Sequence, residues 1–137
     1  MASDSKPATK EVAHAVGRRR RSVATVKLHT GSGEITVNGH PAADYFPGIS
    51  AKVQLERPFS VCSVTKYSAS AKVSGGGKLG QLDALILGIS RCLAHVKAEY
   101  REALRDADLL TRDSRKRQRR MVGMGGKSRR KRQSPKR

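Results

Sequence analysis

Residues 78–97 read KLGQLDALILGISRCLAHVK, and this stretch decides the kind of fold to expect. Its large apolar residues recur every three or four positions, at Leu82, Leu85, Ile86, Ile89, Leu93 and Val96. That spacing is typical of an amphipathic helix whose apolar stripe covers the face of a sheet. Lys78, Asp83 and Arg91 interrupt the run, so it contains no stretch of roughly 18 uninterrupted apolar residues, as a membrane-spanning helix would. We therefore expect a packing helix of a soluble domain, with no membrane partner.

Strands are expected on the N-terminal side of this helix. Residues 22–30 alternate, with Ala24, Val26 and Leu28 on one face and polar side chains on the other, which is typical of a half-buried strand. Residues 34–37 resume the alternation after a Gly-Ser-Gly turn, and this predicts a hairpin between the two runs. Residues 59–73 supply one or two further strands that end at the glycines beginning with Gly75.

Short helices are expected between these strands and after the long helix. Pro41 and Pro47 limit the intervening helices to residues 42–46 and 49–56, and a last helical piece covers residues 99–107. This order of elements predicts an α/β fold. Specifically, we expect a two-layer sandwich in which helices cover one face of a mixed sheet of about four strands.

The charge of the chain is unevenly distributed. Lys and Arg total 29 against 11 Asp and Glu, a formal net charge of +18, which implies an acidic partner. Residues 23–111 are nearly neutral, whereas residues 112–137 carry 13 basic side chains and 1 acidic side chain. We therefore expect a disordered leader over residues 1–17, a globular α/β body over 18–111 and an extended basic tail over 112–137.

Clusters of arginine and lysine flank the body at both ends. The planar guanidinium fork donates two parallel hydrogen bonds to a phosphate oxygen, and a basic tail can order along a phosphate backbone as it releases counterions. The alternative is a solvated polycation or a nuclear-import run. The clustered residues expected to bind nucleic-acid phosphate are Arg18, Arg19, Arg20, Arg21, Arg112, Arg115, Lys116, Arg117, Arg119, Arg120, Lys127, Arg129, Arg130, Lys131 and Arg132.

A glycine-rich turn precedes the long helix. Gly75-Gly76-Gly77-Lys78-Leu79-Gly80 satisfies G-x-G-x-x-G, but a dinucleotide site also needs an acidic residue ending a second parallel strand about 20 positions later. Glu99 falls between helical segments, so we expect no nucleotide cofactor. The backbone N–H groups of Gly75, Gly76 and Gly77, with Lys78 beside them, can instead receive any phosphate, including one in a nucleic-acid backbone. The alternative is a turn that needs positive φ and close packing.

The sequence gives little support for catalysis or for metal binding. The four histidines lie on different expected elements without metal-ligand spacing, and neither paired carboxylates nor a G-x-S-x-G motif occurs. Cys62 and Cys92 are far apart in apolar runs, which favours small core residues in a reducing compartment over a disulfide or a zinc site. We therefore expect no catalytic residue, metal or cofactor.

The kind of nucleic acid follows from what the sequence lacks. No Cys/His finger, leucine zipper or clear helix-turn-helix is present, which disfavours DNA-binding proteins that read bases. The few aromatic residues form no RNP-like run, which disfavours a base-stacking platform. A body with basic extensions that contacts backbone suits a large folded RNA. A DNA-compacting chromosomal protein and a small enzyme that uses the glycine turn are the alternatives.

Several short motifs occur in an order and at a spacing that resemble a known family. They are Gly17-Arg18-Arg19-Arg20, Gly31-Ser32-Gly33 with Ile35-Thr36-Val37-Asn38-Gly39, Tyr45-Phe46, Gly75-Gly76-Gly77 with Gly80-Gln81, Leu110-Thr111-Arg112-Asp113 and Lys136-Arg137. Together they resemble the ninth protein of the small ribosomal subunit, in its bacterial and plastid form. The resemblance implies a left-handed β-α-β crossover, an exception to the usual hand.

The resemblance also implies a function and a place in the cell. It implies a structural, non-enzymatic protein of the ribosome, in a bacterial cytoplasm or in the stroma of a chloroplast or other organelle. The body would bind ribosomal RNA in the head of the small subunit, beside neighbouring head proteins. The tail would extend to the peptidyl-site transfer RNA during translation, where Lys136 and Arg137 are expected to lie beside the anticodon stem-loop.

Overall fold

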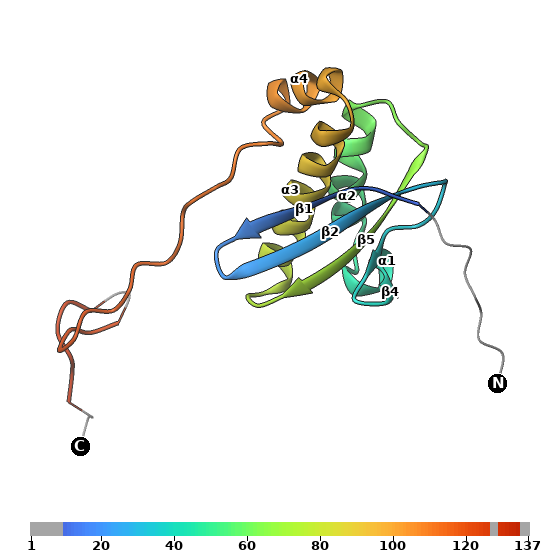
Figure 1. Cartoon of the computed structure of the whole chain (residues 1–137). Helices are drawn as coiled ribbons and strands as arrows, with labels where there is room; N and C mark the ends of the chain where they lie inside the picture. Colours follow the sequence, from blue (N-terminus) through green and yellow to red (C-terminus); the bar gives the residue numbers. More distant parts are fainter. Residues whose placement is uncertain (1–9, 127–128, 135–137) are drawn as a thin grey trace, which may run out of the picture.

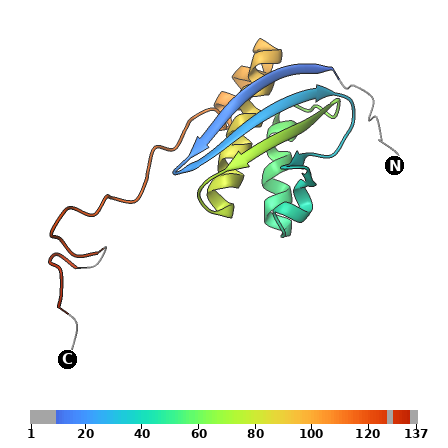
Figure 2. The same cartoon turned by 60° about the horizontal axis from the view of Figure 1, so that its bottom comes forward.

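The computed structural model describes residues 10–126 and 129–134, and its helices and strands lie between residues 11 and 106. The strands form one mixed sheet in the order β1-β2-β5-β3-β4. The helices cover one face of this sheet (Figures 1 and 2), which confirms the α/β class and the layered arrangement. The elements are β1 (Glu11–Arg19), β2 (Ser22–Thr30), β3 (Thr36–Val37), β4 (His40–Pro41), α1 (Ala42–Tyr45), α2 (Ile49–Val61), β5 (Tyr67–Ser74), α3 (Lys78–Val96) and α4 (Ala98–Asp106).

The core lies between α3 and the sheet. Val26 and Leu28 of β2 and Leu85 and Ile89 of α3 are all fully buried, as the alternation and the helical stripe predict. By length and composition α3 could also cross a membrane, although its apolar run is interrupted. Because these apolar side chains pack in the core of the domain, their burial accounts for the composition of the helix.

The expectation of a disordered leader over residues 1–17 is wrong for residues 11–17, because these residues belong to β1. β1 pairs with β2 in antiparallel fashion, with a continuous register from Ala13 to Arg19 and a shift between Glu11 and Ala13. Its inward-facing residues, Ala15 and Gly17, are buried but small, so they give almost no hydrophobic signal. They are small because α3 lies close to the strand: a Cβ on Gly17 would collide with the backbone O of Ala84. The sheet therefore has five strands rather than about four.

The predicted hairpin between residues 22–30 and 34–37 is wrong. One edge of β2 is taken by β1 and the other by β5, so no edge is left for β3. Instead β3 pairs with β5 in parallel and with β4 in antiparallel fashion. Because α1 and α2 connect β3 to its parallel neighbour β5, the sheet contains a β-α-β unit. The left-handed crossover of this unit stays a prediction.

α2 runs five residues past its predicted end at Glu56. It continues through Pro58 to Val61, over residues that were predicted to begin a strand. Proline within a helix removes one backbone hydrogen bond, but Pro58 is fully buried. The apolar contacts of this side chain offset the lost bond, so tertiary packing overrides the local preference.

Residues beyond α4 form neither a helix nor a strand in the described part of the chain. The pairing there is an isolated bridge between Met124 and Lys131. Leu109 and Leu110 still pack against the core, and the chain then leads away from the body (Figure 1).

Candidate nucleic-acid interface

Two of the predicted phosphate-binding segments lie side by side at one end of the sheet. The β1–β2 turn carries Arg20 and Arg21, and the β5–α3 turn carries the glycines. The register pairs Val23 with Ser74, and a Cβ on Gly75 would lie 2.6 Å from the backbone O of Arg21. The sheet topology therefore joins the arginine cluster to the glycine turn, although more than 50 residues separate them in the sequence.

The four hairpin arginines differ in exposure. Arg18, Arg20 and Arg21 are exposed, whereas the side chain of Arg19 is 11% exposed. The first three can offer complete guanidinium forks to a phosphate. Arg19 cannot do so, because all three of its guanidinium nitrogens already contact protein oxygen atoms.

The tail extends the same basic surface. Arg20 of the hairpin and residues 115–121, 124–126, 129 and 130 supply the lining of an open cavity of about 790 Å³. Arg115, Lys116, Arg117, Arg119 and Arg120 are all exposed. The geometry therefore brings the tip of the hairpin and the tail to one concave, strongly basic surface, which suits a polyanion.

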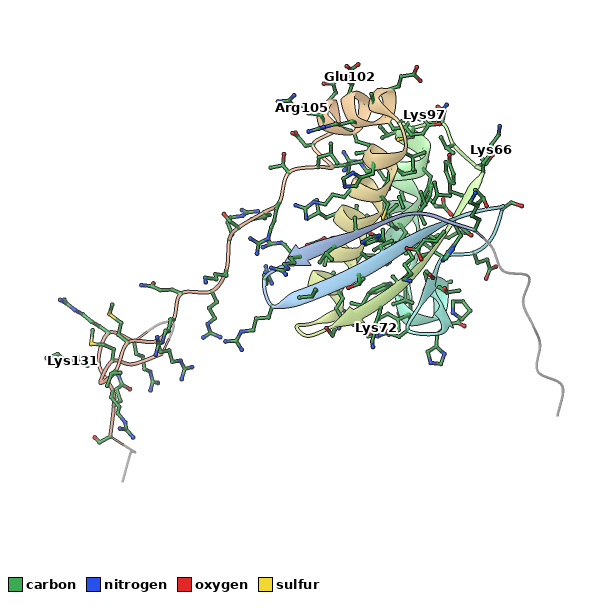
Figure 3. The ribbon with its side chains drawn as sticks, in the orientation of Figure 1. Lys66, Lys72, Lys97, Glu102, Arg105 and Lys131 are labelled. Atoms are coloured by element: carbon green, nitrogen blue, oxygen red, sulfur yellow. The ribbon has the colours of Figure 1, made fainter. Side chains whose placement is uncertain are left out.

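The remaining predicted tail residues fall into two groups. Arg112, Arg129, Arg130, Lys131 and Arg132 are exposed. Figure 3 shows Lys131 far from Glu102 and Arg105 of α4. Lys127, Lys136 and Arg137 lie outside the described residues.

The glycine turn has the positive φ angles and the close packing that were given above as the alternative to a phosphate site. Gly75 and Gly76 have φ of +72° and +67°, a region that favours glycine. A Cβ on Gly76 would collide with the hydroxyl of Ser22. The Lys78 ammonium lies 3.3 Å from the centroid of the Tyr45 ring and donates to the Tyr45 carbonyl at 3.1 Å, so it is already held on the protein. The backbone amides at the start of α3 are what this turn can offer a phosphate.

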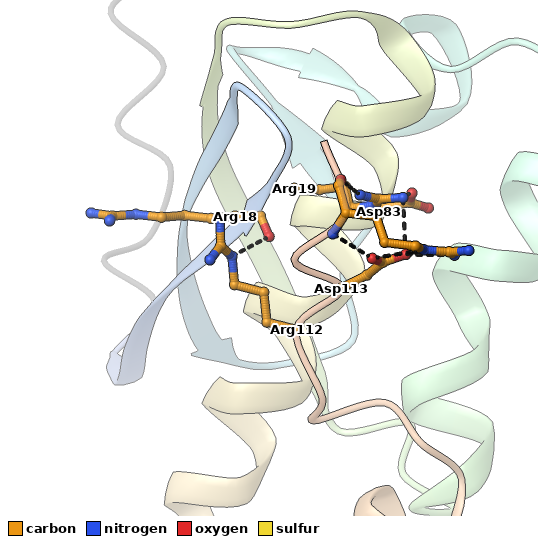
Figure 4. A network of polar contacts seen from close by, with 6 residues as sticks. Arg18, Arg19, Asp83, Arg112 and Asp113 are labelled. Carbon is orange, nitrogen blue, oxygen red and sulfur yellow. Dashed lines mark hydrogen bonds and ion pairs between the residues drawn. The ribbon is translucent and has the colours of Figure 1, made fainter. Parts of the chain in front are cut away.

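Two carboxylates at this end of the molecule were missed by the sequence reasoning. The Nε of Arg19 lies 3.5 Å from Asp83 of α3, and its Nη2 lies 3.0 Å from Asp113 in the tail. Its Nη1 donates to the Arg115 carbonyl at 2.6 Å. Figure 4 shows the Arg19 side chain directed into this cluster and the Arg18 side chain directed away from it. A weak sequence signal existed for Asp113, since an Asp side chain commonly accepts from the backbone two residues later.

Asp113 is ionised over the whole physiological range. Its Oδ1 accepts from the Arg115 backbone N–H at 2.9 Å, and the Arg115 guanidinium donates to both carboxylate oxygens at 2.8 to 3.1 Å. These side-chain and then backbone hydrogen bonds hold the pKa of Asp113 well below its ordinary value, and Arg19 acts in the same direction.

Other chemistry receives no support from the part of the chain that the structure describes. There, no three His, Cys, Asp or Glu side chains lie close enough together to hold a metal ion. Cys62 and Cys92 are buried free thiols, as predicted, and burial raises the pKa of Cys92 to about 12. A thiol of this kind is neutral and unreactive at neutral pH.

Comparison with known proteins identifies the family of this chain. Residues 17–137 match the family described as Ribosomal protein S9/S16. The chain is 40% identical over 119 residues to the small ribosomal subunit protein uS9 of Maridesulfovibrio salexigens, covering 86% of this chain and 92% of that protein. It is 42% identical over 114 residues to uS9 of Cytophaga hutchinsonii, covering 82% of this chain and 89% of that protein. The chain therefore belongs to the ribosomal protein S9/S16 family.

Proposed function

We propose that this protein binds small-subunit ribosomal RNA through Arg18, Arg20 and Arg21 of the hairpin, the glycine turn and the basic tail, and that the tail reaches the peptidyl-site transfer RNA. Membership of the family makes the chain a structural constituent of the small ribosomal subunit rather than an enzyme. Because both relatives are bacterial proteins, we propose a cytoplasmic ribosome rather than one in an organelle stroma.

The observation that carries the RNA-binding proposal is the concave basic surface shared by hairpin and tail. Arg20 and the tail residues line one cavity, and residues 112–137 carry 13 basic side chains against 1 acidic one. Such a surface gains free energy by releasing counterions from a phosphate backbone. The described tail offers no aromatic platform for bases, so we propose that it reads RNA shape and backbone rather than sequence.

The contact with transfer RNA rests on the resemblance of the final Lys136-Arg137 pair to the family pattern. Two adjacent cations at the end of a long basic segment suit the phosphates of an anticodon stem-loop. We propose Arg137 as the phosphate-contacting end and Lys136 as its neighbour. In this division of roles, the body and the earlier part of the tail hold ribosomal RNA, and the last two residues act on transfer RNA.

The salt dependence of binding tests the RNA proposal. If about eight phosphates are neutralised, the log–log slope of affinity against salt is roughly −7 for duplex-like contacts. Filter binding of the full chain to a transcript of bacterial small-subunit ribosomal RNA measures this slope. A flat salt response contradicts the proposal.

Two further measurements separate this proposal from its rivals. After a high-salt wash, the protein should still co-sediment with small ribosomal particles, whereas a nonspecific DNA-compacting polycation would wash off. Titration of the protein with nucleotides should give no saturable binding, because the glycine turn lacks the acidic residue of a dinucleotide site.

A further inference from the structure

Arg19 occupies a different position from the three arginines around it. It ends β1, yet its side chain is 11% exposed and lies between α3 and the start of the tail. A guanidinium in such a place is costly unless each nitrogen finds an acceptor. Here the acceptors are Asp83, Asp113 and the Arg115 carbonyl, so very little of this side chain remains for a phosphate.

The acceptors of Arg19 come from two separate parts of the chain. Asp83 belongs to α3 and is therefore part of the body, whereas Asp113 and Arg115 belong to the first residues of the tail. Arg112 adds a contact of the same kind, because its Nε donates to the Arg18 carbonyl at 3.4 Å. The first residues of the tail are thus attached to the end of the β1 strand.

The cluster is also electrically balanced. Arg19 and Arg115 contribute two positive charges, and Asp83 and Asp113 contribute two negative ones. Within a strongly basic end of the molecule, these four residues add nothing to the net attraction for a polyanion. Their geometry is specific, however, since a guanidinium fork fixes the direction of a carboxylate more strictly than an ammonium does.

From these contacts we infer that Arg19 is a positioning residue: with Asp83 and Asp113 it clamps residues 112–115 to the body and sets the direction of the tail before RNA binds. The benefit for RNA binding rests on the proposed function. A segment that is already ordered in its bound direction loses less conformational entropy on binding. The clamp therefore raises affinity without contacting a phosphate itself.

The test begins with the free protein and its backbone dynamics. In the wild type, the {¹H}–¹⁵N NOE of residues 113–116 should be close to that of the body, and the Arg115 amide should exchange slowly with solvent. Arg19→Gln and Asp113→Asn should each lower the NOE and speed the exchange several-fold, while the amides of α3 stay protected. Asp113→Asn removes the carboxylate of the clamp that belongs to the partly exposed tail. This variant therefore provides the test if Arg19→Gln fails to fold. Unchanged dynamics of residues 113–116 in both variants would overturn the proposal.

The second arm measures binding to the transcript of small-subunit ribosomal RNA. Arg19→Gln should weaken binding about threefold to tenfold yet leave the salt slope unchanged, because no phosphate contact is lost. Arg21→Gln is the matched comparison and should reduce the magnitude of the slope by about 0.9, the value for one phosphate contact. Arg19→Lys keeps the charge but not the fork, so it should behave like Arg19→Gln. Lys66 lies at the other end of the sheet (Figure 3), so Lys66→Gln should change neither the affinity for the transcript nor the salt slope.

The outcomes distinguish the clamp from the proposed function. A loss of slope in Arg19→Gln equal to that in Arg21→Gln, or full rescue by Arg19→Lys, would show that Arg19 is a phosphate ligand and would overturn the clamp. If the wild type fails to bind this RNA, the proposed function fails, and the NMR measurements alone then decide whether the clamp exists.

Discussion

The burial of a side chain, and not only its residue type, decides which arginines of this protein can bind a phosphate. Arg19 and Arg21 are two residues apart, yet one lies against α3 and the other is exposed. The sequence predicts that both are cations near a polyanion, and it cannot tell them apart. The difference depends on Asp83 and Asp113, which are distant in the chain from Arg19 and from each other.

A prediction at the residue scale concerns Cys92, which is fully buried and whose Sγ lies 3.6 Å from the Val26 carbonyl oxygen. Desolvation raises the pKa of this thiol to about 12 in the folded protein, against an ordinary value of 9.0. The unfolded chain therefore loses this proton at lower pH than the folded one does. As pH rises above about 9, the free energy of unfolding should fall by up to about 1.4 kcal/mol per pH unit from this thiol.

Urea unfolding at pH 7.5, 9 and 10 measures the effect, with Cys92→Ala as the control. The variant should be less stable at pH 7.5 because it leaves a cavity, but its stability should fall less steeply with pH. Equal pH dependence in the two proteins would show that the Cys92 thiol is not the source.

At the scale of elements, the sequence predicts those parts whose signal is local. The long helix and the strand over residues 22–30 were found from their apolar periodicity, and both form as α3 and β2. β1 was missed because its inward residues are small, and the pairing of β3 with β5 was missed because it joins segments that are distant in the sequence. The charge clusters were visible in the sequence, whereas their meeting at one end of the sheet required the topology.

The close approach of β1 to α3 gives a prediction for Gly17. Any side chain there would collide with the backbone of α3 at Ala84, and helix backbone cannot yield as a flexible side chain can. Gly17→Ala should lower the free energy of unfolding by about 3 kcal/mol, the upper range for overpacking. Thermal and urea unfolding measure this change.

Gly77→Ala is the matched control for Gly17→Ala. Gly77 has a φ of −112°, and a Cβ there would meet no heavy atom within 4 Å. Gly77 is the N-cap residue of α3. Gly77→Ala should therefore lower the free energy of unfolding of the protein by less than about 1 kcal/mol. Similar losses in both variants would mean that β1 and α3 do not pack as closely as described.

At the scale of the whole molecule, charge and fold are divided between different parts of the chain. The nearly neutral middle builds the core, while the basic residues collect at the hairpin and in the tail. This division limits electrostatic repulsion within the core and leaves the cations free for a large polyanion. The composition predicts the division, and family membership agrees with the kind of polyanion.

The proposed roles of body and tail end can be separated by a deletion. Removing Lys136-Arg137 should leave assembly of the protein into small subunits intact, because the rest of the basic surface remains. Binding of peptidyl-site transfer RNA to those subunits should weaken by about 1–2 kcal/mol, the scale of a few charge-assisted hydrogen bonds. Quantitative transfer-RNA binding to purified subunits measures this. Loss of assembly on deletion would show that the roles are divided differently.

A cryo-electron microscopy map of small ribosomal subunits that contain this chain would show whether the basic tail contacts RNA. In this map, residues 112–137 should lie along ribosomal RNA, with their guanidinium and ammonium groups within hydrogen-bond distance of phosphate oxygens. A map in which the body is docked but this segment extends into solvent, away from every nucleotide, would contradict the proposed RNA binding by the tail.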